Sequence, residues 1–279
     1  MHTAGMMLFA LVGLSLGMLG GGGSVLAVPI LVLALGLDPH DAVPASLLII
    51  ALTSAFAVVP HARAGRVRWR VGIVFGGAGM IGSFLAGLVA RWIPGELLLV
   101  LLAAMMGVIA ISMLRGGTTT PEQAARESAA RGPMTARDVR ALLLRGLLVG
   151  SATGLVGAGG GFVIVPALVL LCSLPMADAI GTSLFVIVLQ AMAGFAGHAS
   201  HAAVPWELVA QVSTLAIAGS IVGALVAGRV PQGALRKAFG VLVLGVAALL
   251  LVQRIASLRA SGQHGRTAAR MAGHPLRGA

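Results

Sequence analysis

Charged side chains are scarce in this chain, and their scarcity sets the class of protein. Of 279 residues, 10% are charged and 58% are hydrophobic, whereas soluble domains average about 25% and about 45–50%. No Asp, Glu, Lys or Arg occurs before Asp38. A helix that crosses the hydrocarbon core needs about 20 mostly apolar residues. The composition therefore predicts a polytopic membrane protein in contact with a lipid bilayer.

Cysteine and the motifs of common enzymes are also missing. Cys172 is the only cysteine, which excludes an internal disulfide and a cysteine-based metal cluster. There is no Gly-x-x-x-x-Gly-Lys motif for ATP, no His-Glu-x-x-His zinc motif and no pair of aspartates in mid-span. We therefore expect no enzyme, no cofactor and no metal site.

Long runs without charge follow one another along the chain. The first, Thr3–Leu37, lacks the basic start of a signal peptide, and many more runs come after it, so we expect it to be retained. The further runs are Ala42–Pro60, Val71–Ala90, Leu97–Leu114, Gly146–Ala177, Ala179–Gly197, Leu208–Gly228 and Ala238–Val252. Most of them reach the roughly 17–25 residues of a membrane span.

The basic residues give a formal charge of +11, but they are gathered in short stretches beside the uncharged runs. Fifteen of the nineteen lie at Arg63–Arg70, Arg115–Arg145 and Arg254–Arg277, and the other four are Arg91, Arg229, Arg236 and Lys237. This is the distribution that orients membrane proteins through the positive-inside rule, so we expect no nucleic-acid partner. The tail is also suited to contact anionic lipid headgroups.

The second half of the chain repeats the first at an offset of 137 positions, the difference between Pro166 and Pro29. The register holds from Gly13 to Leu98 without a gap, and it aligns rare residues such as Trp69 with Trp206. We therefore predict a duplication, a common way to build a transporter with its site at the repeat interface.

The predicted fold is all-α, with about eight transmembrane segments in two homologous four-segment repeats whose first helices are broken by glycine. The expected units are repeat 1 (residues 1–114), a cytoplasmic linker (115–141), repeat 2 (142–252) and a basic flexible tail (253–279).

Two topologies are open, because the Gly-rich runs are too long for one straight span and too short for two. If each crosses once as an interrupted helix, the three basic stretches share one side and both termini are cytoplasmic. If each is re-entrant, the repeats are inverted and the basic tail moves outside. The charge count favours one crossing.

The two glycine clusters carry the functional prediction. Gly20–Gly23 precedes Pro29, and Gly157–Gly161 precedes Pro166 at a matching distance. Glycines let a helix break, and a half-helix that starts after the break presents free N–H groups and a positive dipole end to an anion. Alternatively, the glycines serve close helix packing.

Few polar side chains accompany these breaks. Asp41 and Asp178 begin the second span of each half, as N-caps or as proton-coupling groups. Ser46, Thr182 and Ser183 lie one turn deeper, where they bind an anion or bond back to their own helix.

His61 and His198 end the same spans, either solvated at the boundary or coupled to protons. Gln190 lies deep in its span and either lines a path or cross-links helices. The predicted substrate-binding residues are Gly20, Gly21, Gly22, Gly23, Ser24, Pro29, Ser46, Gly157, Gly159, Gly160, Gly161, Pro166, Thr182, Ser183 and Gln190.

With these motifs, the chain resembles the sulfite exporter TauE/SafE family. The resemblance rests on Gly17–Gly23 with Val28–Pro29, on Gly154–Gly161 with Val165–Pro166, and on Asp41–Ala42 and Asp178–Ser183. It covers most of the chain, from Gly13 to Val252. It implies a multi-pass permease of the bacterial inner membrane that moves sulfite, organosulfonates or other small sulfur-containing or carboxylate anions. Repeat 1 departs from the pattern, with Val43–Ser46 where repeat 2 has Ile180–Ser183.

We therefore expect a permease that moves a small anion by alternating access between the two repeats. The alternatives are an intramembrane enzyme, which would need a nucleophile and base or a metal, and a non-transporting assembly subunit, which would not need two broken helices. The apolar outer surface faces lipid as readily as a second copy in a homo-oligomer.

Overall fold

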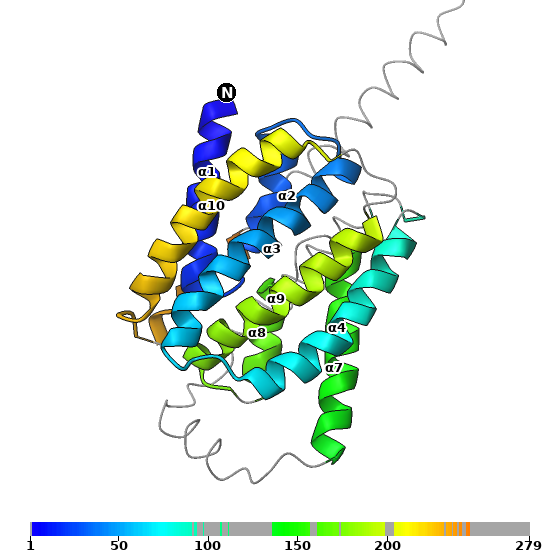
Figure 1. Cartoon of the computed structure of the whole chain (residues 1–279), viewed down its shortest axis with the longest axis vertical. Coiled ribbons are helices and arrows are strands. Elements are labelled where there is room, and N and C mark those ends of the chain that lie inside the picture. The colour runs from blue at the N-terminus through cyan, green and yellow to red at the C-terminus, as the bar shows by residue number, and fades with distance from the viewer. Residues whose placement is uncertain are drawn as a thin grey trace, which may run out of the picture.

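The computed structural model describes residues 2–90, 136–156, 161–172, 174–198 and 204–231, with isolated positions outside these ranges. The described part is helical throughout (Figure 1). Its helices are α1 (His2–Leu19), α2 (Ser24–Leu33), α3 (Pro39–Arg63), α4 (Trp69–Ala90), α7 (Ala136–Val156), α8 (Gly161–Leu170), α9 (Met176–His198) and α10 (Trp206–Ala227). The predicted all-α class is confirmed for these residues.

Four of the described helices are long and apolar enough to cross a membrane, namely His40–Arg63, Trp69–Val89, Met176–His198 and Trp206–Ala227. They match four of the uncharged runs. Their outer surfaces carry large apolar side chains that are more than half exposed, such as Ile81, Leu85 and Leu225. Helices that are apolar on all sides belong in lipid. The described part therefore has the surface of a polytopic membrane protein.

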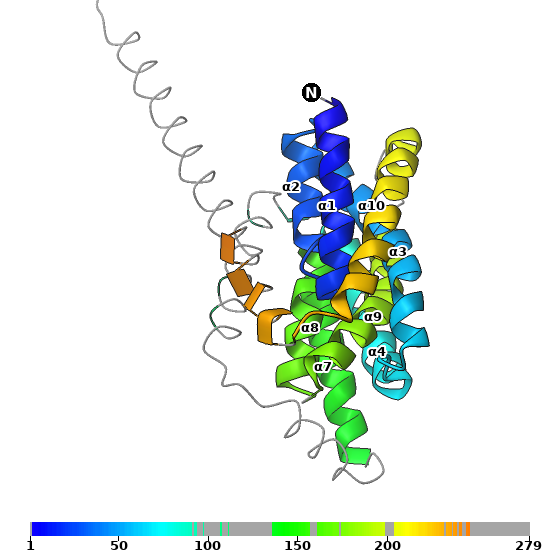
Figure 2. The same ribbon diagram turned by 90° about the vertical axis from the view of Figure 1, so that its left-hand side faces the viewer.

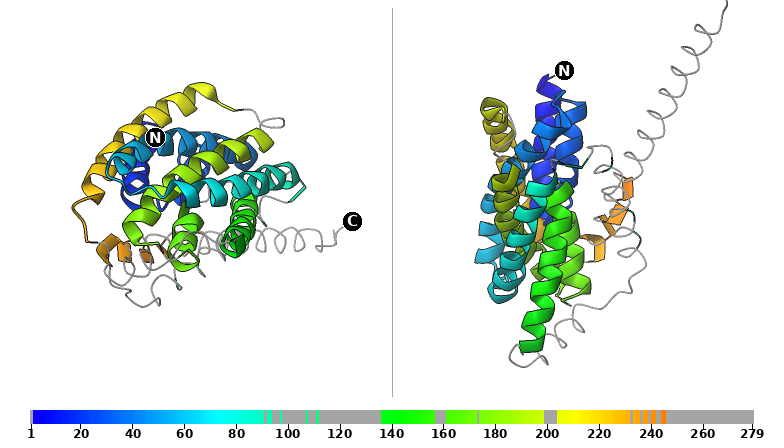
Figure 3. Two further views of the ribbon diagram at one scale, coloured as in Figure 1. Left: turned by 60° about the horizontal axis from the view of Figure 1, so that its bottom comes forward. Right: turned by 90° about the vertical axis from the view of Figure 1, so that its right-hand side faces the viewer.

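The centre of the bundle is formed by α3 and α9. In the apolar stretches of α3 and α9, 67% and 61% of the residues are buried, against 44% in those of α4 and α10. In the left-hand view of Figure 3, the other helices lie around this pair. The two central helices are therefore the ones whose polar side chains lie inside protein and not against lipid.

The chain breaks at the first glycine cluster, as predicted. α1 ends at Leu19 and α2 begins at Ser24. Gly20, in between, has φ of 72°, a left-handed conformation that glycine adopts without steric cost. The equivalent break between α7 and α8 falls on residues 157–160, which lie outside the described residues.

Close approaches between helices fix the direction in which each helix runs. Gly13 of α1 packs against Ala216 of α10. One turn later, Gly17 packs against Ser220. Because the residue numbers rise together, α1 and α10 run parallel.

The same contacts recur between α7 and α4. Gly150 packs against Gly79. One turn later, Gly154 packs against Ser83. Each of these residues is displaced by 137 positions from its counterpart in the α1–α10 pair (150 − 13 and 216 − 79). α4 and α7 therefore run parallel to one another.

The chain reverses at the first glycine cluster. The imidazole Nε2 of His61, in the last turn of α3, lies 3.0 Å from the carbonyl oxygen of Gly17, in the last turn of α1. α1 and α3 therefore run in the same direction, and α2 between them must return. Figures 1 and 2 show α2 folded back beside α1. The prediction of one crossing by an interrupted helix is wrong for Thr3–Leu37, and the re-entrant alternative holds there.

One end of the bundle collects the basic residues of the described part, and we call it the basic end. It holds the loop of Arg66 and Arg68, where α3 ends and α4 begins, and the start of α7 with Arg137 and Arg140. Arg229 follows α10 at this end as well, because Gly228 lies beside the guanidinium of Arg66. Figure 3 shows α7 extending beyond its neighbours here.

The N-terminus lies at the other end of the bundle, since α1 runs toward the basic end (Figure 1). The expectation that both termini share the side of the basic loops therefore does not fit the N-terminus. Of the predicted linker 115–141, residues 136–141 belong to α7, and the rest, like the predicted tail 253–279, lies outside the described residues.

Candidate functional site

The first glycine break meets the start of α8 at the centre of the molecule. Gly21 and Gly161 approach so closely that a methyl group on either would overlap the backbone of the other. Gly20 lies against Ile180 and Ser183 of α9. Because α2 begins at Ser24 and α8 at Gly161, two helix N-termini converge here. The positive ends of two helix dipoles are thus brought close together.

Each serine near the break donates to a backbone carbonyl. Ser24 Oγ lies 2.7 Å from the oxygen of Gly21, three residues earlier. Ser46 Oγ lies 2.7 Å from the oxygen of Val43. For Ser46, the alternative of bonding back to its own helix is confirmed. Anion binding by Ser24 stays a prediction.

Ser183 makes a longer connection. Its Oγ lies 2.7 Å from the oxygen of Gly20 and 2.8 Å from that of Ile180, in its own helix. The first bond links α9 of the second half to the helix break of the first half. A carbonyl left without its helical partner at the end of α1 is thereby satisfied.

The glycines of the break also serve packing. A methyl group added at Gly23 would overlap Val12 and Leu16 of α1, and one added at Gly21 would overlap Gly161. The packing interpretation of these two glycines is therefore confirmed, and anion binding by them stays a prediction. Gly22 is buried between them.

The remaining predicted residues of the breaks lie in or beside α8 and α2. Pro29 is inside α2 and Pro166 inside α8, as predicted. Gly157, Gly159 and Gly160 lie outside the described residues.

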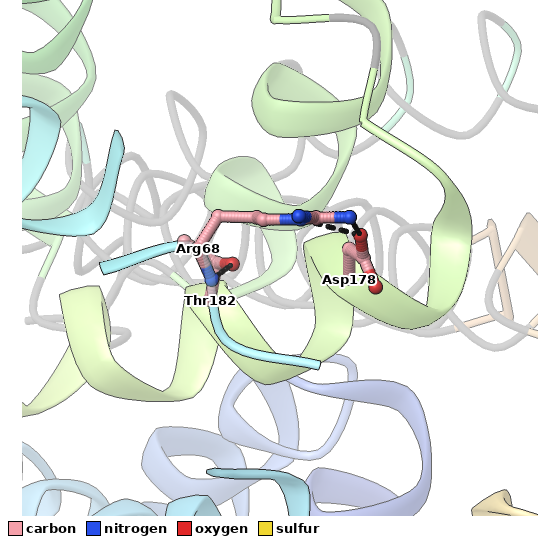
Figure 4. Close-up of polar contacts among 3 residues, drawn as sticks. All are labelled: Arg68, Asp178 and Thr182. Carbon is pink, nitrogen blue, oxygen red and sulfur yellow. Dashed lines mark hydrogen bonds and ion pairs between the residues drawn. The ribbon is translucent and has the colours of Figure 1, made fainter. Parts of the chain in front are cut away.

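Asp178 and Thr182 are held by the loop between α3 and α4 (Figure 4). Arg68 Nε and Nη2 each lie 2.7 Å from Asp178 Oδ2. The backbone N–H of Arg68 donates to Thr182 Oγ1 at 2.9 Å. Asp178 lies within the first turn of α9 and is not its N-cap. Its carboxylate forms an ion pair with a residue 110 positions back in the chain, and proton coupling by it stays a prediction.

Asp41, the counterpart of Asp178, is not the N-cap of its helix either. α3 begins at Pro39, and Asp38 caps it by accepting from the N–H of His40 at 2.9 Å. Asp41 lies in the first helical turn. There a carboxylate is favoured by the helix dipole.

Gln190 cross-links helices, one of the two roles predicted for it. It is 1% exposed, and Thr153 Oγ1 of α7 lies 3.3 Å from its Oε1. Ser83 Oγ of α4 donates to its backbone oxygen at 2.9 Å. Its amide nitrogen lies against Gly79 and has no hydrogen-bond partner among the described residues.

The two histidines differ in their contacts. His61 is 2% exposed, so the prediction of a solvated boundary residue is wrong for it. Its Nε2 donates to Gly17 of α1, whereas His198 Nδ1 donates to Gly194 of its own helix at 2.9 Å. The matched residues therefore hold different parts of the structure.

The sequence did not single out Arg68 or Thr153. Arg68 is one of several loop arginines, and its partner Asp178 is too distant in the chain for any local pattern to pair them. Among the described residues, no group of His, Cys, Asp and Glu is arranged to hold a metal ion.

Comparison with known proteins identifies the family. The profile described as "Sulfite exporter TauE/SafE" matches residues 6–250. A "Probable membrane transporter protein" of Xylella fastidiosa (strain Temecula1) is 34% identical over 251 residues, covering 89% of this chain and 94% of the relative. "Probable membrane transporter protein YdhB" of Bacillus subtilis (strain 168) is 29% identical over 242 residues, covering 87% and 96%. No solved structure gives a significant match. The chain, with its re-entrant glycine break, belongs to the sulfite exporter TauE/SafE family.

Proposed function

We propose that this chain is a membrane transporter for a small anion such as sulfite, an organosulfonate or a related carboxylate. The observation that carries the proposal is the convergence of the α2 and α8 N-termini at the Gly21–Gly161 contact. The positive dipole ends of these two helices favour an anion in a medium with little water. The family and its relatives, named as transporters, support transport over intramembrane catalysis.

The substrate-binding residues of this proposal are the glycines and Ser24 of the first break together with Gly161 and, outside the described residues, Gly157, Gly159 and Gly160. Ser183 supports the site by holding the Gly20 carbonyl. Pro29 and Pro166 each remove one N–H from the half-helices and bend them. Ser46, Thr182 and Gln190 have protein partners in this conformation, and we assign them supporting roles.

The architecture of the proposal is two inverted repeats. α1 runs toward the basic end, while α7, its counterpart by 137 positions, starts there and runs away. Inverted repeats give a transporter two conformations of similar energy that open to opposite sides. We propose alternating access by this route, with the basic end in the cytoplasm because of its arginines. The membrane is then the inner membrane of a bacterium, and the N-terminus lies on its outer side.

Uptake into proteoliposomes tests the function. The purified chain is reconstituted and offered labelled sulfite, with taurine-like sulfonates and small carboxylates as competitors. We expect saturable uptake that needs the protein and is reduced by at least one competitor class. Uptake equal to that of empty liposomes for every anion of the panel would contradict the proposal and favour an assembly subunit.

A further inference from the structure

The loop between α3 and α4 fastens the basic end of the bundle to the other half of the protein. Arg68 forms an ion pair with Asp178 through two 2.7 Å contacts, and its N–H donates to Thr182. Asp178 and Thr182 lie in the first two turns of α9. A charge-assisted pair supported by a backbone hydrogen bond is more directional than an isolated surface pair. The side chain of Asp178 is 14% exposed and that of Arg68 is 52% exposed, so solvent screens the pair from the arginine side only.

Arg66 adds two contacts from the same loop. Its backbone oxygen lies so close to Gly181 that a methyl group there would overlap it. Its guanidinium lies beside Gly228, the C-cap of α10, where the negative end of the helix dipole favours a cation. One short loop therefore holds the start of α9 and the end of α10.

The opposite end cannot form the same contacts. By the 137-residue offset, the counterpart of Arg68 is Pro205, which has neither a charged side chain nor an N–H. The counterpart of Thr182 is Ala45, which has no acceptor in its side chain. Gly181, which admits the loop backbone, corresponds to Pro44. The repeats are thus unequal at this place.

We propose that Arg66 and Arg68 with Asp178, Gly181 and Thr182 form a one-sided latch that holds the basic end closed. The inference rests on the proposed alternating access. Two inverted repeats of equal sequence would favour neither conformation. A latch on one end alone shifts the population toward the conformation in which that end is closed. Opening the basic end then requires the Arg68–Asp178 pair to separate, and the latch sets how often this happens.

A distance measurement tests the latch without any transport. Spin labels are placed on cysteines at Ala64, at the end of α3, and at Leu171, after α8, in a Cys172→Ala background, and the protein is held in lipid nanodiscs. For Asp178→Asn and Arg68→Gln, we expect the ratio of long to short distances to rise about threefold or more. The exchanged pair, Arg68→Asp with Asp178→Arg, should return the ratio toward that of the parent.

Glu207→Gln is the matched control, because Glu207 is an exposed acid in the first turn of α10, at the opposite end. It should leave the distances unchanged. If Asp178→Asn does not fold, Thr182→Val takes its place in the comparison. This variant removes only the side-chain acceptor of the Arg68 N–H. Distances equal to those of the parent in the folded latch variants would overturn the latch, even if the protein transports anions. A shift without any uptake would instead keep the latch and count against the proposed function.

Discussion

His61 Nε2 donates to the carbonyl oxygen of Gly17 across 3.0 Å, joining the last turn of α3 to the last turn of α1. Gly17 lies three residues before the helix break, where carbonyls lose their partners in the helix. The imidazole therefore supports the break from the side. This contact also shows that α1 and α3 run in the same direction.

We predict that His61→Leu destabilises the protein, because it leaves a buried carbonyl without a donor, at a cost of about 1–3 kcal/mol. His61→Gln should be milder, since its amide nitrogen can take the place of Nε2. The measurement is thermal unfolding in detergent. If Leu and Gln have equal effects, the hydrogen bond is not what His61 contributes.

His198→Leu serves as the comparison for His61. The His198 ring bonds to Gly194 in its own helix, so its loss should not affect the glycine break. We expect transport to fall more in His61→Leu than in His198→Leu. The reverse order would assign the support of the transport site to the second half.

Gly21→Ala should destabilise the protein by about 1–3 kcal/mol, because the methyl group has no room against the Gly161 backbone. Gly77→Ala in α4 is the control, since a methyl group there has no neighbour within 4 Å among the described residues. Gly87 is a poor control, because its methyl group would meet His198. Equal melting temperatures for Gly21→Ala and Gly77→Ala would contradict the observed packing.

Ser183→Ala should lower stability by about 1 kcal/mol and reduce transport, because it frees the Gly20 carbonyl. Ser46→Ala removes a bond to Val43 in its own helical turn but leaves the Gly20 carbonyl paired with Ser183, so it should reduce transport less than Ser183→Ala does. The comparison is made by uptake rates at equal amounts of reconstituted protein. Loss of transport in Ser46→Ala alone would reverse these roles.

The topology of the first half can be read with reporters at its ends. A cysteine at Ala64 and one at Met7, each in a Cys172→Ala background, should react with a membrane-impermeant reagent from opposite sides of the membrane. Ala64 is exposed at the end of α3, at the basic end, and Met7 near the start of α1 is 72% exposed. Labelling of both from the same side would restore the single crossing by an interrupted helix.

The helices and the first glycine break could be predicted from the sequence, because apolar runs and glycine clusters act locally. The offset that aligns Trp69 with Trp206 also relates the contacts that recur between α1 and α10 and between α7 and α4. The reversal at Gly20 could not be predicted from charge. A single crossing of each Gly-rich run would place Arg229 opposite the basic loops, whereas the structure has its neighbour Gly228 beside Arg66. The direction of a ten-residue helix such as α2 depends on tertiary packing. The positive-inside rule counts basic residues and contains no information about packing.

The polar residues show the same division. Ser46 bonds within its own turn, as local reasoning allowed. Asp178 is paired with Arg68, 110 residues away, and the counterpart of Arg68 is Pro205, so the repeat gave no signal for the pair. Contacts that break the internal symmetry are the ones that an internal repeat cannot predict.

The central claim is that an anion binds where α2 and α8 begin, and Gly22→Ala tests it most directly. Gly22 lies inside the break, two residues before α2, so a methyl group there would obstruct a ligand on the backbone amides. The measurement is the rise in melting temperature on addition of sulfite, for the parent, Gly22→Ala and Gly77→Ala. We expect sulfite to raise the melting temperature of the parent and of Gly77→Ala. We expect no such rise for Gly22→Ala. A rise in folded Gly22→Ala equal to that of the parent would contradict the account.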